Sequence, residues 1–220
     1  MADLSKRDLD IIRQQLRKPS EEQGLAMAEH MDKGNRPMIL HTLAAVDPQP
    51  GEHLLEVGMG SGRFVPRLLA LDPTLRYTGC DYSSDMVNIA TEVNRSYVDT
   101  HRARFVQASV EKMPFSTASF DQVFTINTLY FWESLSAGLQ EVHRVLKVGG
   151  TFILSFRPDH LLRILETTQE GFAIYSLQRI QDACDAVGLQ YRSLTKVMEP
   201  IGHWDKTTPY ESWMLAVQKR

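Results

Sequence analysis

The sequence predicts an α/β fold: a doubly wound, mostly parallel seven-stranded sheet with helices on both faces, preceded by an N-terminal helical extension. Two observations support this prediction. Apolar runs of strand length alternate with amphipathic helical patterns from residue 54 onward. The first of these runs ends in a glycine-rich turn that opens a helix, within residues 54–69.

Three helices are expected before the first strand. An apolar stripe predicts a helix over residues 4–18, which the proline at position 19 ends. Ser20 and Gln23 have the spacing of a capping box, so a second helix should run to about residue 33. Asn35 is suited to cap a third helix, which ends before the proline-rich loop at 47–51.

That loop marks a boundary between an N-terminal helical extension, residues 1–50, and a core domain, residues 51–220. The extension has two interpretations. Its helices either pack on the core and keep it soluble, or form a lid over a ligand cleft. In the second case Asn35 and Arg36 are available to meet a carboxylate group.

The core domain should hold seven strands separated by helices. We expect the strands at 54–57, 75–80, 104–107, 120–126, 151–156, 190–198 and 210–217. Helices are expected to begin at Arg63 and just after Asp81, and to cover 136–146 and 176–187. The glycines at 149 and 150 are interpreted as the cap that ends the helix over 136–146.

Composition excludes several classes of protein. The net charge of −3 gives no basic surface, so nucleic acid is not expected as a partner. No apolar run approaches the ~20 residues that a membrane helix needs, and no signal peptide is visible. Cys80 and Cys184 make no disulfide framework, so a cytoplasmic location is expected. No spacing typical of metal ligands is present.

The glycine spacing discriminates between nucleotide ligands. Dinucleotide sites have G-x-G-x-x-G, whereas Gly58, Gly60 and Gly62 form G-x-G-x-G, and Arg63 stands where the dinucleotide pattern has its third glycine. Glu56 would repel a pyrophosphate and attract a cation. S-adenosylmethionine (SAM) is a cationic ligand of this kind, with an ammonium, a sulfonium and no phosphate. A plain turn after a core strand is the alternative.

Asp81 ends the second predicted strand, nineteen residues after Gly62. A carboxylate in this position can accept hydrogen bonds from both hydroxyls of a ribose. The alternative is an N-cap for the next helix, but Ser83 can cap that helix instead. Tyr82 and Met86 are placed to flank an adenine ring, although core packing explains Met86 nearly as well.

Polar and aromatic residues follow the fourth predicted strand, where ligands bind in open α/β sheets. We expect Tyr130 and Trp132 to form a wall of the cleft and Phe131 to pack against the next helix. No residue is an unambiguous general base. The candidates are Tyr130, His160 and His203, and a lone histidine is more often structural.

Four segments in order resemble the class I SAM-dependent methyltransferases: residues 56–62, Asp81, 110–121 and 144–150. The resemblance covers about residues 50–157. The stretches EKMPF and RVLKVGG are similar to those of a small-molecule group that includes the ubiquinone and menaquinone C-methyltransferases. The resemblance implies a Rossmann-like fold. It also implies methyl transfer from SAM to a small-molecule acceptor by in-line displacement, with S-adenosylhomocysteine (SAH) as product.

The resemblance also implies a role for individual residues. Glu56 would hold the methionine ammonium, Asp81 the ribose, and the backbone N–H of Val110 the adenine. The implied cofactor contacts are Glu56, Gly58, Met59, Gly60, Gly62, Asp81, Tyr82, Met86, Ser109, Val110, Glu111, Asn127 and Leu129. Ser109 departs from the family, which often has an aspartate there, so the adenine loses a charged acceptor. Expected substrate contacts are Asn35, Tyr130, Trp132 and Arg157.

Three other functions stay open at this point. A dinucleotide oxidoreductase would need the glycine that Arg63 replaces. An RNA or protein methyltransferase would need a recognition surface for its target, and a nucleic-acid enzyme a basic one. A non-catalytic SAM-binding sensor or partner subunit would keep the cofactor site without turnover. The acceptor, the methylated atom and the oligomeric state leave no signature in the sequence.

Overall fold

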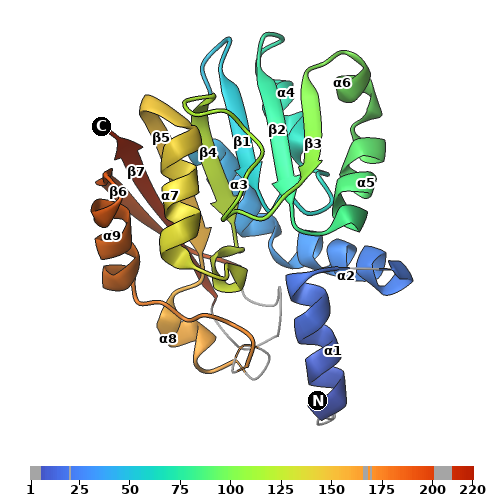
Figure 1. Cartoon of the computed structure of the whole chain (residues 1–220). Coiled ribbons are helices and arrows are strands. Elements are labelled where there is room, and N and C mark those ends of the chain that lie inside the picture. The colour runs from blue at the N-terminus through green and yellow to red at the C-terminus, as the bar shows by residue number, and fades with distance from the viewer. Residues whose placement is uncertain (1–5, 20, 166–167, 169, 201–209) are drawn as a thin grey trace.

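The computed structural model describes residues 6–19, 21–165, 168, 170–200 and 210–220 (Figure 1). Its seven strands form one sheet in the order β3-β2-β1-β4-β5-β7-β6. The strands are β1 His53–Val57, β2 Arg76–Asp81, β3 Ala103–Gln107, β4 Phe120–Ile126, β5 Leu146–Phe156, β6 Leu189–Met198 and β7 Glu211–Lys219. The first five strands are parallel, and β7 runs antiparallel to both β5 and β6. The predicted fold class is therefore confirmed.

Helices surround this sheet and precede it. They are α1 Lys6–Arg17, α2 Glu21–Gly34, α3 Arg36–Val46, α4 Val65–Leu69, α5 Ser84–Val93, α6 Arg95–Asp99, α7 Leu135–Val145, α8 Asp159–Leu162 and α9 Leu177–Ala186, with a 3₁₀ turn at Leu129–Phe131. Three helices come before β1, as predicted. The short α6 and α8 were not predicted. Ser20, the expected cap of α2, lies outside the described residues.

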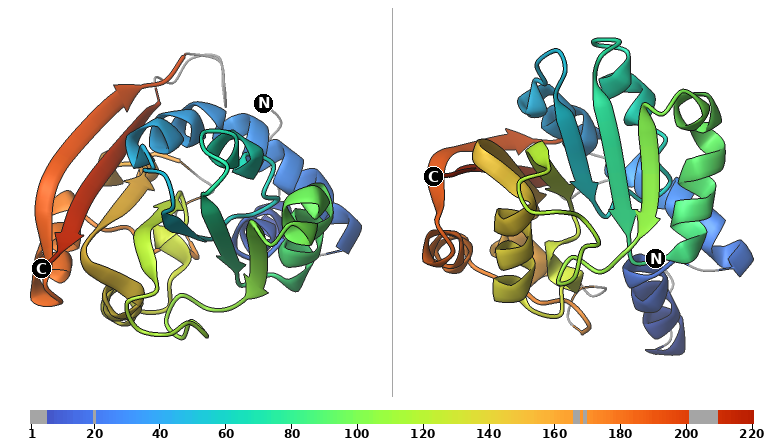
Figure 2. Two further views of the ribbon diagram at one scale, coloured as in Figure 1. Left: turned by 90° about the horizontal axis from the view of Figure 1, so that it is seen from above. Right: turned by 45° about the horizontal axis from the view of Figure 1, so that its top comes forward.

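Two apolar cores hold the helices on opposite faces of the sheet. Successive residues of β1 alternate between them: Leu55 and Val57 face α7 and α9, and Leu54 faces α3 and α4. Figure 2 shows the blue α3 and the yellow α7 on opposite sides of the sheet. The central strands are buried on both faces, and apolar residues therefore stand at consecutive positions in them, such as Leu54 and Leu55 in β1 and Val123 and Phe124 in β4, which helped to predict them.

The residues after α7 correct one prediction. Gly149 and Gly150 do not cap that helix, which ends at Val145, because β5 begins directly afterwards at Leu146. The pairing of β4 with β5 shifts register here, so the glycines lie in a bulge of β5. A Cβ on Gly150 would lie 2.7 Å from the carbonyl oxygen of Asp121, so this position requires a residue without a side chain.

The first two helices, α1 and α2, lie beyond the carboxyl ends of the central strands (Figure 1). In chain order, α1 and α2 come first, and α3 then packs on β4 and β5. The hydroxyl of Thr42 in α3 donates to the hydroxyl of Ser155 in β5 at 2.6 Å. Within the described part of the chain, no helix combines the length and apolar character needed to cross a membrane.

A buried ion pair joins the end of β5 to the end of β6. Arg157 is 4% exposed, and its two terminal nitrogens donate to the two carboxylate oxygens of Glu199, one of them at 3.0 Å. The guanidinium also lies over the ring of Tyr210, 5.5 Å from its centroid. Arg157 was expected to contact a substrate. In the structure this side chain instead pairs with Glu199 at the antiparallel edge of the sheet and does not line the cleft described below.

Breaking this pair should lower stability. Arg157→Met leaves the carboxylate of Glu199 buried without its cation, which costs about 3–5 kcal/mol. Urea unfolding followed by circular dichroism measures the loss. The double variant Arg157→Met with Glu199→Leu should recover most of the stability, because both charges are then absent. A single variant within about 1 kcal/mol of the parent chain would contradict the prediction.

Gly62 should tolerate a side chain less well than another left-handed glycine. A Cβ on Gly62 would lie 2.9 Å from the Cβ of Ala90, and its φ is +66°. Gly51 has a φ of +83° and no atom within 4 Å of the same position. Gly51→Ala should therefore cost about 1 kcal/mol for backbone strain alone. Gly62→Ala should cost about 2–4 kcal/mol, since overlap adds to that strain. If urea unfolding shows the same loss of stability for Gly51→Ala and Gly62→Ala, the predicted overlap at Gly62 is wrong.

Candidate functional site

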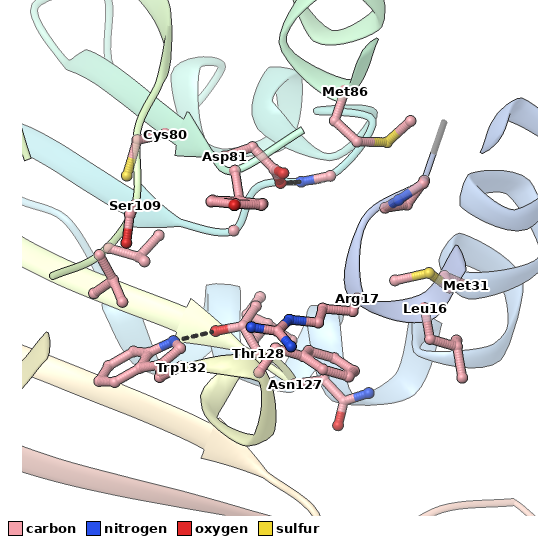
Figure 3. A pocket seen from close by; sticks show the side chains of 18 of the residues that line it. Leu16, Arg17, Met31, Cys80, Asp81, Met86, Ser109, Asn127, Thr128 and Trp132 are labelled. Carbon is pink, nitrogen blue, oxygen red and sulfur yellow. Dashed lines mark hydrogen bonds between the residues drawn. The ribbon is translucent and has the colours of Figure 1, made fainter. Parts of the chain in front are cut away.

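A cleft opens at the carboxyl ends of β1, β2 and β4 (Figure 3). Segments far apart in sequence meet here. The lining residues from the core domain include Gly58, Gly60, Asp81, Tyr82, Met86, Ser109, Val110, Glu111, Asn127, Thr128, Phe131 and Trp132. Those from the N-terminal helices and the residues that link them include Leu16, Arg17, Pro19, Ala28, Met31, Asp32 and Asn35.

The turn after β1 lets its backbone approach the cleft closely. Gly58, Gly60 and Gly62 have φ values of +75°, +56° and +66°. The N–H of Gly58 donates to the carbonyl of Cys80 at 2.7 Å, which ties the turn to β2. A Cβ on Gly58 would collide with the methyl of Thr128, whereas a Cβ on Gly60 would meet no atom. Gly60 therefore presents bare backbone to open space in the cleft, as a close ligand requires.

The carboxylate of Asp81 is fixed by backbone donors. Its Oδ2 accepts from the N–H of Gly60 at 3.1 Å, and its Oδ1 accepts from the N–H of Ser83 at 2.9 Å. Burial raises the pKa of Asp81, while these N–H groups act in the opposite direction. Ser83, and not Asp81, is the N-cap of α5, where its hydroxyl accepts from the N–H of Met86. Asp81 is thus held in place while its remaining acceptor capacity stays available to the cleft.

Glu56 lies in a smaller cavity that adjoins the cleft and shares Gly58 and Gly60 with it. Met59 and Gly62 also line that cavity. The pKa of Glu56 is raised to about 7, mainly by burial and also by the nearby Asp81 and Asp32, while the hydroxyl of Tyr77, which donates to Glu56 at 2.6 Å, opposes the shift. A buried carboxyl without a cationic partner should ionise more readily when a positively charged ligand binds.

Asn127 follows β4 in a left-handed conformation, with a φ of +60°. Its Nδ2 donates to the Oδ1 of Asn35 at 3.2 Å, which joins α3 to the cleft. Its own Oδ1 is buried and has no partner among the described residues. Asn35 begins α3 but makes no side-chain capping bond, contrary to prediction. An acceptor that lacks a donor, next to strained backbone, fits a site that is completed by a ligand.

The loop after β3 forms another wall, with Ser109, Val110 and Glu111 in the lining. The hydroxyl of Ser109 donates to Glu111 Oε2, and Glu111 Oε1 accepts from the N–H of Glu133 at 2.8 Å. Across the cleft, Tyr82 is half exposed and Met86 is buried. Met86 therefore serves both as core packing and as cleft lining.

Acidic side chains of α2 reach the glycine turn. Asp32 Oδ2 accepts from the hydroxyl of Ser61 at 2.6 Å, and its pKa is raised, mainly by burial. Arg63 pairs with Glu29 at 2.8 Å and lies 3.6 Å from Asp32. No sequence pattern singled out the lining residues Asp32, Met31, Leu16 and Arg17, because solvated charges and apolar stripes occur on most helices.

The aromatic segment differs from the prediction by one residue. Phe131 and Trp132 line the cleft, but Tyr130 does not. Tyr130 is buried, and its hydroxyl accepts from the backbone N–H of Arg157, so the expected wall and packing roles of Tyr130 and Phe131 are exchanged. Burial raises the pKa of Tyr130, which disfavours a role as base. Leu129 is also buried and outside the lining.

Of the two histidine candidates, His160 does not line the cleft. His160 pairs with Glu211 at 2.8 Å and lies near the ring of Trp213, at the β7 edge of the sheet. His203 lies outside the described residues. The structure therefore brings together the expected cofactor residues, with the exception of Leu129, and separates Arg157, Tyr130 and His160 from them.

Comparisons with known proteins agree with this arrangement. Residues 55–154 match the family described as "Methyltransferase domain". The fatty-acid O-methyltransferase of Mycolicibacterium smegmatis is 32% identical over 132 residues, which are 59% of this chain and 46% of that protein. The demethylmenaquinone methyltransferase of Roseiflexus sp. (strain RS-1) is 32% identical over 123 residues, 55% of this chain and 50% of that protein. The chain thus spans about half the length of these two curated relatives.

A solved structure shares the fold. Geranyl diphosphate C-methyltransferase from Streptomyces coelicolor A3(2), in complex with Mg²⁺, geranyl diphosphate and SAH, superposes with a TM-score of 0.68 at 15% identity. The match covers 84% of this chain and 77% of that chain. The sequence match over residues 55–154, the seven-stranded sheet and the glycine turn agree, and over this stretch the chain is similar to methyltransferase domains.

Proposed function

We propose that this chain transfers a methyl group from SAM to a small-molecule acceptor. The observation that best supports the proposal is the fixed carboxylate of Asp81 beside the bare backbone of Gly60, where β1 and β2 end. A ribose fits against such a carboxylate, because both of its hydroxyls are donors. The acids around the turn favour a cationic cofactor over a dinucleotide.

The other residues of the cleft fit the remaining parts of SAM. Glu56 and the unpartnered Oδ1 of Asn127 would accept from the methionine ammonium. The loop at Ser109 and Val110, opposite Tyr82, would hold the adenine. Ser109 already donates to Glu111, so the carboxylate of Glu111 gives this loop a charge that the family usually derives from an aspartate at position 109.

SAM supplies an activated methyl group, so the chain's own residues mainly need to bind, orient and exclude water. Alignment of acceptor and donor can supply roughly 7–11 kcal/mol of the barrier. The cleft wall formed by Phe131 and Trp132 would position the acceptor. Trp132 is itself held by a hydrogen bond of 3.3 Å from its indole N–H to the hydroxyl of Thr128.

We propose that residues 1–50 act as a lid over the bound cofactor. Contacts of α2 with the turn support this proposal, since Glu29 and Asp32 bond with Arg63 and Ser61. The hydroxyl of Ser83 donates to the carbonyl of Pro19 at 2.6 Å, which joins the segment after α1 to the start of α5. A cytoplasmic location remains our prediction from cysteine usage.

Cofactor binding should depend on Asp81. Calorimetric titration should give micromolar binding of SAH and none of NADH. Asp81→Asn loses charged hydrogen bonds worth about 1.5–3 kcal/mol, so SAH should bind roughly 10–100-fold more weakly. Asp99→Asn, on the exposed α6, is the matched control and should bind like the parent chain. NADH binding, or equal SAH affinity in Asp81→Asn, would overturn the assignment. SAH binding without turnover on any acceptor would favour a sensor or partner subunit.

Affinity for SAH should rise with pH through the pKa of Glu56, near 7. The ammonium of the ligand favours the ionised carboxylate, so binding below that pH must release a proton. We expect affinity to fall by up to about tenfold between pH 7 and pH 6 and to change little above pH 8. Titrations in buffers of different ionisation enthalpy would count the proton released. Glu56→Gln should abolish this dependence, and an unchanged slope in that variant would exclude Glu56 as its source.

A further inference from the structure

Arg17, the last residue of α1, projects into the cleft. Figure 3 shows its guanidinium inside the cleft beside Thr128, on the far side from Asp81. Apolar side chains of three separate segments line the same cavity, namely those of Leu16, Met31 and Phe131. The described lining therefore includes one cationic side chain, that of Arg17, together with these apolar groups and with polar residues such as Thr128 and Glu133.

The guanidinium of Arg17 is weakly paired. Its nearest ion-pair partner among the described residues is Glu133, with 3.9 Å between Nη2 and Oε1. The two side chains are 50% and 70% exposed, so the pair is screened by solvent and contributes little. Most of its five N–H donors are thus free to bind a ligand, and a guanidinium binds a carboxylate through two parallel hydrogen bonds.

Three of the four carboxylates among the described lining residues accept hydrogen bonds within the protein, and the fourth, that of Glu133, is the weak partner of Arg17. Asp32 accepts from Ser61, and both oxygens of Glu111 accept hydrogen bonds. Asp81 is held by the backbone N–H groups described above. The described residues that line the cleft include no histidine and no lysine. An alcohol, a phenol or a protonated amine must lose a proton to be methylated, and among the described lining residues only carboxylates, which are weak bases, could take it.

We propose that the methyl acceptor is a carboxylate with an apolar body, and that Arg17 binds its carboxylate group. This inference rests on the proposed methyltransferase function and deepens it. A carboxylic acid is ionised at neutral pH, since its pKa is near 4, and needs no base. Its negative charge also complements a cationic methyl donor.

The reaction balances without a further reactant. One carboxylate oxygen forms the new O–CH₃ bond with its own electron pair. The S–CH₃ bond breaks, and its electron pair stays on sulfur, which gives SAH and a neutral methyl ester. The negative charge of the acceptor and the positive charge of the sulfonium disappear together, so no proton is released.

The test uses matched acceptors that differ only in the reacting group. Octanoate and 3-phenylpropanoate are compared with 1-octanol and 3-phenylpropanol, with methylated product measured by mass spectrometry. We expect methyl esters from the acids, no ethers from the alcohols, and no proton release in a weakly buffered assay. Calorimetric titration of octanoate into SAH-saturated protein gives a readout that is independent of turnover.

Variants of Arg17 then test the residue. Arg17→Ala should weaken octanoate binding and lower kcat/KM by roughly 10–100-fold, the value of charge-assisted hydrogen bonds. Affinity for SAH should stay within about twofold, which also shows that the variant is folded. Arg17→Lys should retain part of the effect, since it keeps the charge and loses the planar fork. Arg7→Ala, in the first turn of the same helix, is the control and should match the parent chain.

Each contrary outcome has a distinct meaning. Equal methylation of acids and alcohols, or an Arg17→Ala variant with unchanged octanoate binding, overturns the inference. A large loss of SAH affinity in Arg17→Ala also overturns it, because Arg17 then binds the cofactor. If SAH binds but neither acid is converted to its methyl ester, the proposed acceptor class is wrong, and the proposed cofactor site is not affected. Failure of SAH to bind the parent chain instead overturns the proposed function itself.

Discussion

The site depends on one connection, the hydrogen bond from the N–H of Gly60 to the carboxylate of Asp81. It joins the turns that follow two neighbouring parallel strands, so neither turn can shift without the other. The left-handed backbone of the glycine turn lets the N–H of Gly60 come close enough to Asp81 to form this bond. The start of α5 at Ser83, and through it the carbonyl of Pro19, are attached to the same carboxylate. The carboxylate is therefore in position before any ligand arrives, which reduces the ordering cost of binding.

Much of this fold could be predicted from the sequence because its determinants are local. Strands buried on both faces contain consecutive apolar residues, and α7 has a clear apolar stripe from Leu139 to Val145. Gly150 was misassigned because glycine after a helix is most often a cap. Its real constraint is the carbonyl of Asp121 on a neighbouring strand, which no local pattern reveals. The roles predicted for Tyr130 and Phe131 were exchanged. A single 3₁₀ turn is too short to show a periodicity, so the sequence does not indicate which of its side chains points toward the cleft.

The cleft residues that come from the strand ends could be predicted better than those that come from the N-terminal helices, again because only local determinants can be recognised in a sequence. Glu56, the glycines and Asp81 lie at fixed offsets from strands, so their positions follow from spacing. Arg17 and Asp32 reach the cleft only through the tertiary placement of α1 and α2. Their residue types are common on solvated helices, and nothing in their sequence neighbourhood marks them. The cleft residues that come from α1 and α2 are thus the ones that local sequence patterns predict least well.

The strand order also dictates a sequence of assembly. β7 lies between β5 and β6, although it follows both in the chain. As the chain is synthesised, β1 to β5 can pair with one another as they emerge, but β6 has no strand beside which to lie until residues 211–219 have been made. Strands β1 to β5 can thus begin to fold before the antiparallel edge forms. Until then, the residues of β5 that later pair with β7, such as Phe156 opposite Trp213, stay exposed. That interval makes this edge the point at which a nascent chain is most open to aggregation or to chaperone capture.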